Sequence, residues 1–295
     1  NVFLNNKLRM KETLSVQLLR TLLKGRDQLS GEAIERIAHF VLSQRRDEGA
    51  FMDKSGQSDL YYTVFGRMLS YVLSLPSDSK KNGVYLANLD VDNLDLIHYA
   101  AYMRCRMIQQ LMDGRKIELL FKSFFSTKIK ALEDFCCVPH NDIQSPYTQF
   151  VWLSLLEDTG VKVQSSKFKV QSTRFDLSAY RAKDGGYMNI IDGLTATTNA
   201  TVAALAIKGQ LDGYRDNADI RYLYDLQETS GGFAAAKASP LPDLLSTATS
   251  LFMLNCYGMK PKFAARDFIE AHWLDSGGFS ATLMEDKSDV EYTFY

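Results

Sequence analysis

The sequence contains few cysteines, almost no net charge and no long apolar run. Four cysteines stand irregularly among 295 residues, which does not suit a disulfide framework, so we expect a reducing compartment such as the cytoplasm. The formal net charge of -1 gives no attraction to polyanions, so nucleic acid is not an expected partner. No apolar stretch reaches the roughly 18 residues of a membrane-spanning helix, and we therefore expect no transmembrane segment.

Several familiar motifs are also missing. There is no phosphate loop, dinucleotide fingerprint or nucleophile elbow, so the sequence predicts no cofactor. Cys136, Cys137 and His140 offer three metal donors, but adjacent cysteines rarely hold one zinc ion together. We therefore interpret them as ordinary side chains. The hydrophobic fraction of 46% is enough for a buried core.

One phrase recurs along the chain: a glycine-aromatic loop followed by an aspartate that precedes an apolar segment. It is clearest at Gly231-Gly232-Phe233 with Asp243, at Gly277-Gly278-Phe279 with Asp289, and at Gly49-Ala50-Phe51 with Asp59. A threonine follows each aspartate four positions later. Gly185-Gly186-Tyr187 keeps the loop and leads to a helix start near 195, and weaker copies of the start stand at 95 and 144.

The six starts, at 59, 95, 144, 195, 243 and 289, recur roughly every 50 residues apart from one shorter interval, as in repeats built from one helical hairpin each. Residues 31–42 have the spacing of an amphipathic helix, which Ser30 can cap. We expect Gly49 to end this helix and Asp59 to start the next one. Residues 60–73 are apolar almost all round, which predicts a buried helix.

These patterns predict an all-α fold in one domain covering residues 1–295. Six buried helices inside six amphipathic ones would form a double ring with a central cavity, whereas an open solenoid is the alternative. The sixth inner helix has little room, because Tyr295 follows soon after position 289. Either the natural protein continues, or a helix around 14–23 fills the gap.

The repeats resemble those of the prenyltransferase β-subunit and squalene-oxidocyclase family, most closely at Gln227-Glu228-Thr229-Ser230-Gly231-Gly232-Phe233. The resemblance covers nearly the whole chain. It implies an α/α toroid whose cavity accepts an isoprenoid or another long apolar ligand. It also implies a helical partner subunit.

The resemblance further implies a zinc site that this chain does not keep. At the equivalent positions Asp243 is present, but Leu245 replaces the family's cysteine and Tyr292 replaces its histidine. A leucine supplies no metal donor, so we expect no metal. By the same resemblance Lys237 is the remaining half of a diphosphate contact, and Asp243 is a candidate catalytic residue whose alternative role is a helix cap.

Terpene cyclases of the same family protonate an alkene with the central aspartate of Asp-x-Asp-Asp. Asp90-Val91-Asp92-Asn93 differs from that motif by one residue, so Asp92 is a candidate general acid. Such an acid needs burial or a neighbouring carboxylate to keep its proton. The alternative is a polar loop that precedes a helix.

The inward positions of the buried helices, counted from each start, are rich in aromatic residues. Aromatic rings can bury an apolar chain and stabilise passing cations, although a core packed by its own aromatics would show the same pattern. The same count also selects Phe65 and Tyr295. The predicted substrate-binding residues are Tyr61, Tyr62, His98, Tyr102, Tyr147, Phe150, Lys237 and Tyr292.

Three functions follow. The first is a prenyltransferase-like or cyclase-like toroid that binds an isoprenoid without the usual zinc. The second is a non-catalytic protein-interaction module on the same fold. The third is proton transfer by Asp92.

Overall fold

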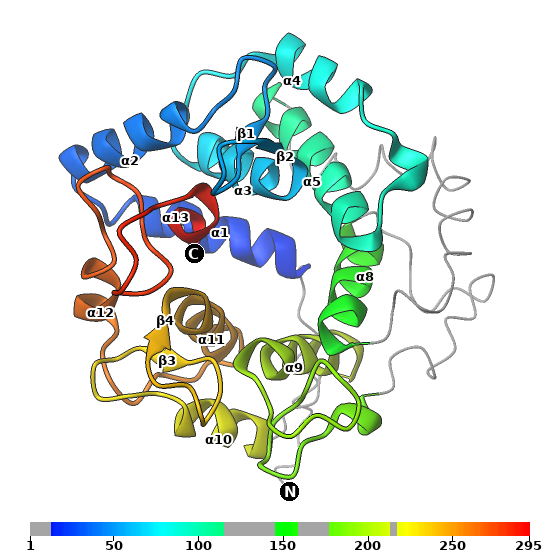
Figure 1. Cartoon of the computed structure of the whole chain (residues 1–295), viewed down its shortest axis with the longest axis vertical. Helices are drawn as coiled ribbons and strands as arrows, with labels where there is room; N and C mark the ends of the chain where they lie inside the picture. The colour runs from blue at the N-terminus through cyan, green and yellow to red at the C-terminus, as the bar shows by residue number, and fades with distance from the viewer. Residues whose placement is uncertain (1–12, 115–144, 159–176, 213–216) are drawn as a thin grey trace, which may run out of the picture. The chain divides into compact units, whose positions relative to one another are not determined.

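A computed structural model describes residues 13–114, 145–158, 177–212 and 217–295. The described residues are mostly helical, with eleven α-helices and two short two-stranded sheets (Figure 1), which confirms the all-α prediction. The chain divides into two compact units. The first unit takes its described residues from Asn1–Leu18, Ile143–Glu157 and Val163–Phe268, and the second takes them from Leu19–Asp142, Asp158–Lys162 and Ile269–Tyr295.

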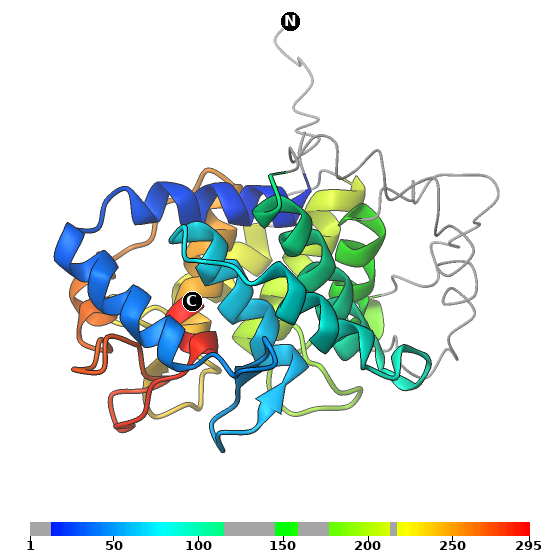
Figure 2. The ribbon, with the colours of Figure 1, turned by 90° about the horizontal axis from the view of Figure 1, so that it is seen from above.

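The second unit is built around two long helices, α3 and α5, which pack side by side (Figure 2). A short antiparallel ribbon, in which Phe51 pairs with Asp59, precedes α3. Helix α1, Leu14–Arg26, has residues in both units. The elements of the second unit are α2 Gly31–Ser43, β1 Phe51–Met52, β2 Ser58–Asp59, α3 Leu60–Val72, α4 Ser79–Ala87, η1 Val91–Asn93, α5 Leu96–Met112 and α13 Val290–Phe294.

The first unit is packed around α9 and α11, which contact each other. Its core includes Leu205, Leu223 and Phe233, none of which is accessible to solvent. The last residues of α8 and α12 belong to the second unit. The elements of the first unit are α8 Pro146–Asp158, η3 Ser178–Tyr180, α9 Thr198–Asp212, α10 Asn217–Asp225, β3 Phe233–Ala234, β4 Pro242–Asp243, α11 Leu244–Cys256 and α12 Arg266–Glu270.

The predicted starts of the inner helices are confirmed to within three residues, because α3, α5, α8, α9, α11 and α13 begin at residues 60, 96, 146, 198, 244 and 290. Four of them have an aspartate cap whose carboxylate accepts the amide N–H three positions on, which satisfies one of the free amides of a helix start. These caps are Asp59, Asp95, Asp243 and Asp289. The fourth start is displaced because Thr197 takes the cap position and accepts from the amide of Ala200 at 3.3 Å.

The threonine of each repeat explains why the loop and the helix start occur together. The Thr247 hydroxyl accepts a hydrogen bond from the Phe233 amide at 2.9 Å and donates one to the Asp243 carbonyl oxygen at 2.7 Å. The same pair of bonds occurs at Thr63, Thr201 and Thr293. One hydroxyl therefore joins the aromatic residue of the loop to the first turn of the helix in four repeats.

The predicted end of the first outer helix was wrong. Ser30 caps this helix as expected, accepting from the Ala33 amide at 3.1 Å, but α2 ends at Ser43 rather than at Gly49. Gly49 instead forms a loop turn with φ of +90°, where an added Cβ would lie 2.9 Å from the Asn82 backbone nitrogen. A residue with a side chain is strained at positive φ, so the loop turn needs a glycine here. Because α2 ends six residues earlier, this glycine does not end the helix.

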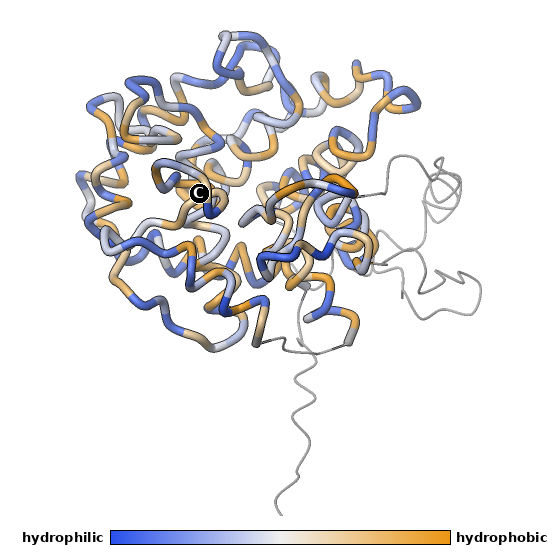
Figure 3. The backbone as a smooth tube through the Cα atoms, turned by 60° about the horizontal axis from the view of Figure 1, so that its bottom comes forward, coloured by the Kyte–Doolittle hydropathy of each residue, from blue (hydrophilic) through white to orange (hydrophobic). Residues whose placement is uncertain are grey.

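Hydropathy follows these elements. Apolar stretches run along the helices, whereas polar stretches are common in the connecting segments (Figure 3). In the part of the chain that the structure describes, no helix has the length and apolarity needed to cross a membrane.

Candidate functional site

Helices α3 and α13 lie against each other within the second unit. The Tyr61 hydroxyl donates to the Glu291 carboxylate at 2.9 Å, across 230 positions of sequence. One turn further along, the rings of Phe65 and Phe294 approach to 5.1 Å between centroids. Three predicted substrate-binding residues, Tyr61, Tyr62 and Tyr292, are thereby brought to one place, and all three are partly exposed.

A buried carboxylate lies beside these tyrosines. Asp289 is only 2% exposed, and its Oδ1 accepts from the Tyr292 amide at 2.8 Å. Its second oxygen has no hydrogen-bond partner among the described residues and faces the Lys54 ammonium at 3.7 Å. Lys54 also forms an ion pair with Glu285 at 3.2 Å and lies 4.9 Å from the centre of the Tyr292 ring.

Burial favours the neutral forms of these acids. It raises the pKa of Asp289, although the Tyr292 amide and Lys54 act in the opposite direction. It also raises the pKa of Glu291, against the hydrogen bond from Tyr61. The pKa of Tyr62 is raised by burial and then by the negative charge of the two carboxylates. The largest cause of each shift is burial, because removing a charged group from water favours its neutral form, and the neighbouring negative charges add to it.

We call this group the acidic-aromatic cluster. Two carboxyl groups that hold their protons more tightly than usual lie among partly exposed phenol rings, so the cluster can offer a proton, and its rings can stabilise a cation. Its members are Lys54, Tyr61, Tyr62, Asp289, Glu291 and Tyr292.

Two other predicted residues, His98 and Tyr102, lie on α5, and each contacts other residues of this helix or of its cap. The His98 ring lies 2.9 Å from the Asp95 carboxylate, and its side chain is 41% exposed. The Tyr102 ring lies 6.3 Å from that of Tyr99, and the Arg106 guanidinium donates to the Tyr102 hydroxyl at 3.4 Å.

The candidate acid Asp92 lies exposed in the one-turn helix η1. Its neighbour Asp90 accepts a hydrogen bond from the Asn93 side chain at 2.7 Å. The burial that would keep a carboxyl protonated is found at Asp289, on α13, and not at Asp92.

The remaining predicted residues belong to the first unit. Asp243 caps α11 and accepts from both the amide and the hydroxyl of Ser246 at 2.7 Å. Lys237 is exposed; its ammonium donates to the Asp184 carbonyl oxygen at 2.9 Å and lies 5.3 Å from the centre of the Tyr222 ring.

Tyr147 and Phe150, both on α8, complete the predicted set in the first unit. The Tyr147 amide donates to the Asn189 side chain at 3.3 Å, and Phe150 packs against the core. Both side chains are partly exposed.

Within the described ranges, no three His, Cys, Asp or Glu side chains are grouped so that they could hold a metal ion. Cys136, Cys137 and His140 lie outside the described residues.

Sequence reasoning missed Lys54, Asp289 and Glu291 as site residues. Glu291 occupies an inward position by the same count that selects Tyr292, but a search restricted to aromatic residues passes over it. A search for any acidic residue at an inward position would have found it. Lys54 stands in a loop, and nothing in its sequence context distinguishes it from other surface lysines.

Comparison with known proteins adds no assignment to this site: no protein-family model matches the chain, and no curated protein matches it.

Proposed function

We propose that this chain binds an isoprenoid or another long apolar molecule at the acidic-aromatic cluster, without a catalytic zinc ion. The observation that carries the proposal is the meeting of α3 and α13, which gathers partly exposed tyrosines around two carboxyl groups with raised pKa values. When such rings bury an apolar chain, the free energy gained is roughly 25 cal/mol per Å² of apolar area removed from water.

The proposed architecture is an α/α toroid of six helical hairpins in one domain. Its support is the contact between the first and last inner helices, which a solenoid that stays open does not make. The Tyr61 to Glu291 hydrogen bond and the Phe65 to Phe294 ring contact are the described parts of that contact. The shared loop geometry of four repeats supports the same reading.

The chemistry that suits the cluster is proton transfer to an alkene. A carboxyl group at Asp289 or Glu291 would give its proton to one alkene carbon, which leaves a carboxylate and a carbocation at the other carbon. The faces of Tyr61, Tyr62 and Tyr292 would stabilise that cation. In this proposal the acid role that the sequence suggested for Asp92 passes to Asp289, which is buried, and Glu291, which is partly buried.

The test is a calorimetric titration with farnesol as the apolar probe and glycerol as the polar comparison. The wild-type protein should bind farnesol and not glycerol. Tyr62→Ala should weaken farnesol binding by about tenfold, since it removes about 1–2 kcal/mol of apolar contact. Tyr71→Ala is the matched control, because Tyr71 stands on the same helix, partly exposed, outside the cluster. Equal loss in both variants, or no binding by the wild type, would contradict the proposal.

A protein-interaction module is the second candidate, favoured by apolar residues on the loops. Leu194 is 97% exposed and Ile190 74% exposed, both in the loop that precedes α9. Large exposed apolar side chains close together often mark an interaction surface. If a helical partner subunit binds there, Leu194→Asp should abolish its binding in sedimentation experiments and leave farnesol binding unchanged.

A further inference from the structure

Arg67 is a charged side chain in the interior of the second unit. It stands on α3 and is only 1% exposed. One terminal nitrogen donates to the carbonyl oxygens of Asn82 at 3.1 Å and Gly49 at 3.4 Å. The other two nitrogens of the guanidinium have no partner among the described residues. A buried cation with unused donors costs stability unless something compensates its charge.

The groups around Arg67 do not supply that charge. Burial lowers the pKa of Arg67, and the positive Arg45 lowers it further. Cys105 and Tyr85 are the neighbours that could become anionic, but burial raises the pKa of the Cys105 thiol to about 11 and also raises the pKa of Tyr85. Both are therefore neutral near pH 7, so none of these groups is a counterion for the two arginines.

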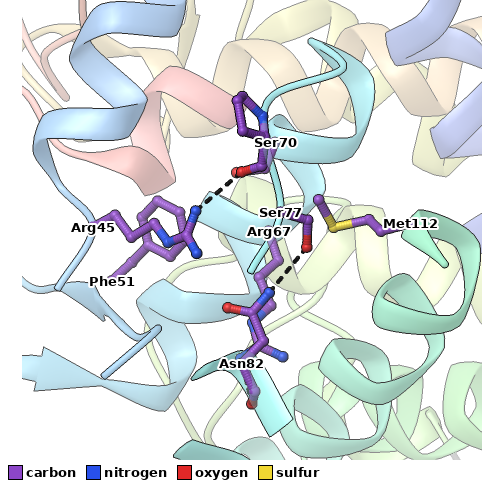
Figure 4. A pocket seen from close by; sticks show the side chains of 8 residues that line it. Arg45, Phe51, Arg67, Ser70, Ser77, Asn82 and Met112 are labelled. Carbon is purple, nitrogen blue, oxygen red and sulfur yellow. Dashed lines mark hydrogen bonds between the residues drawn. The ribbon is translucent and has the colours of Figure 1, made fainter. Parts of the chain in front are cut away.

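Both arginines line one small pocket (Figure 4). Its free volume of about 10 Å³ suits a single water-sized occupant. The pocket reaches the surface at Pro76 and Ser77, which are exposed. It is braced by a hydrogen bond from Arg45 to the Pro76 carbonyl oxygen at 3.0 Å, and by one from the Asn82 amide to the Ser77 hydroxyl at 3.3 Å. The lining residues are Arg45, Phe51, Arg67, Ser70, Pro76, Ser77, Asn82 and Met112.

We infer that this pocket binds a small monovalent anion of the size of chloride. The lining supplies two guanidinium groups and hydroxyl groups, and it contains no acidic side chain. The free space is close to that of one water molecule, so only a single-atom anion suits it, whereas a tetrahedral oxyanion such as sulfate has five heavy atoms and does not fit. A bound anion would neutralise Arg67 and so strengthen the connection between α3, the Gly49 loop and α4. This inference is independent of the proposed function, because the pocket lies outside the acidic-aromatic cluster.

The first test uses the unmodified protein. Its melting temperature should rise with chloride and then saturate, by roughly 2–4 °C at most, when sodium chloride replaces sodium gluconate at constant ionic strength. Sodium sulfate should give no saturable rise at the same sodium concentration. Crystals soaked in bromide should show an anomalous peak beside Arg67. Equal melting temperatures in chloride and gluconate, together with no bromide peak, would overturn the inference and leave a water molecule as the occupant.

The second test uses charge-removing variants. Arg67→Gln should lose the chloride-dependent rise, and Arg45→Gln should weaken the apparent chloride affinity by about tenfold. Arg46→Gln is the matched control, because Arg46 is adjacent, exposed and outside the pocket lining, and it should keep the wild-type response. If Arg67→Gln does not fold, the difference between Arg45→Gln and Arg46→Gln decides. The same chloride response in these two variants would contradict a site at this pocket.

Discussion

The starts of α11 and α13 show how the same local structure can place its capping aspartate in two different environments. At α11, in the first unit, Asp243 caps the helix and Thr247 ties the cap to Phe233. At α13, in the second unit, Asp289 and Thr293 make the same bonds. The hydrogen bonds at the start of α11 are therefore equivalent to those at the start of α13.

The surroundings of the two aspartates differ. Asp243 also accepts from the Ser246 hydroxyl at 2.7 Å. Asp289 has Tyr292 at the position of that serine, is almost fully buried, and faces Lys54. The comparison teaches that the loop and cap set where an acid stands, whereas the helix packed against it sets how readily that acid ionises.

The strongest test of the shared scaffold is its first loop glycine. An added Cβ would lie 2.0 Å from the Ala264 carbonyl oxygen at Gly231, and 2.4 Å from the Arg36 carbonyl oxygen at Gly277. Both glycines have φ above +90°. Each Gly→Ala change should cost about 1–2 kcal/mol for the backbone conformation and about 1–3 kcal/mol more for the overlap, as measured by urea unfolding.

Gly185 is the control for that experiment. It has φ of +104°, but no atom lies within 4 Å of its added Cβ. Gly185→Ala should therefore show only the backbone cost. If it destabilises the protein as much as Gly231→Ala, the close approach does not explain the scaffold's need for glycine.

The next test removes the threonine hydroxyl. Thr247→Val keeps the side-chain shape but leaves the buried Phe233 amide without its acceptor, so it should cost about 1–3 kcal/mol of unfolding free energy. Thr293→Val should cost a similar amount if the two scaffolds are equivalent. Thr249→Val is the control, since the Thr249 hydroxyl donates only within its own helix. A cost at Thr247 no larger than at Thr249 would contradict the role given to this hydroxyl.

A smaller effect should appear at Asp289 as the pH changes. The pKa of Asp289 is raised in the folded state, so the folded protein binds more protons than the unfolded chain. The contribution of Asp289 to stability should therefore fall as pH rises from about 4, the unfolded value, through the folded pKa, and then stay constant.

Asp289→Asn keeps a good helix cap and removes this titration. Its unfolding free energy should decline less with pH than that of the wild type over the same range. Asp243→Asn in the first unit is the control, because it shows how replacing a capping aspartate by asparagine changes the free energy of unfolding. A wild-type pH profile in Asp289→Asn would show that this carboxyl does not have a raised pKa.

Much of the secondary structure could be predicted because its determinants are local. The aspartate cap, the threonine four positions later and the loop glycine act within one repeat, so they are visible as a spacing in the sequence. Where the local signal had changed, the prediction was less accurate: Thr197 replaces the aspartate before α9, and the predicted start fell three residues early. The prediction that Gly49 ends the preceding helix was wrong because a glycine with positive φ suits a loop turn as well as a helix end.

The candidate site could be predicted only in part. Tyr61, Tyr62 and Tyr292 were selected by their inward positions, and the structure brings them together. The sequence by itself determined the six helix starts, because each depends on hydrogen bonds between residues close together in the chain. It also showed which aromatic residues follow each start. Only the tertiary structure decided that Glu291 meets Tyr61 and that Asp289 is buried beside Lys54. This contact and this burial arise because helices far apart in the chain pack together and exclude water from the two carboxyl groups. No spacing between nearby residues predicts that packing.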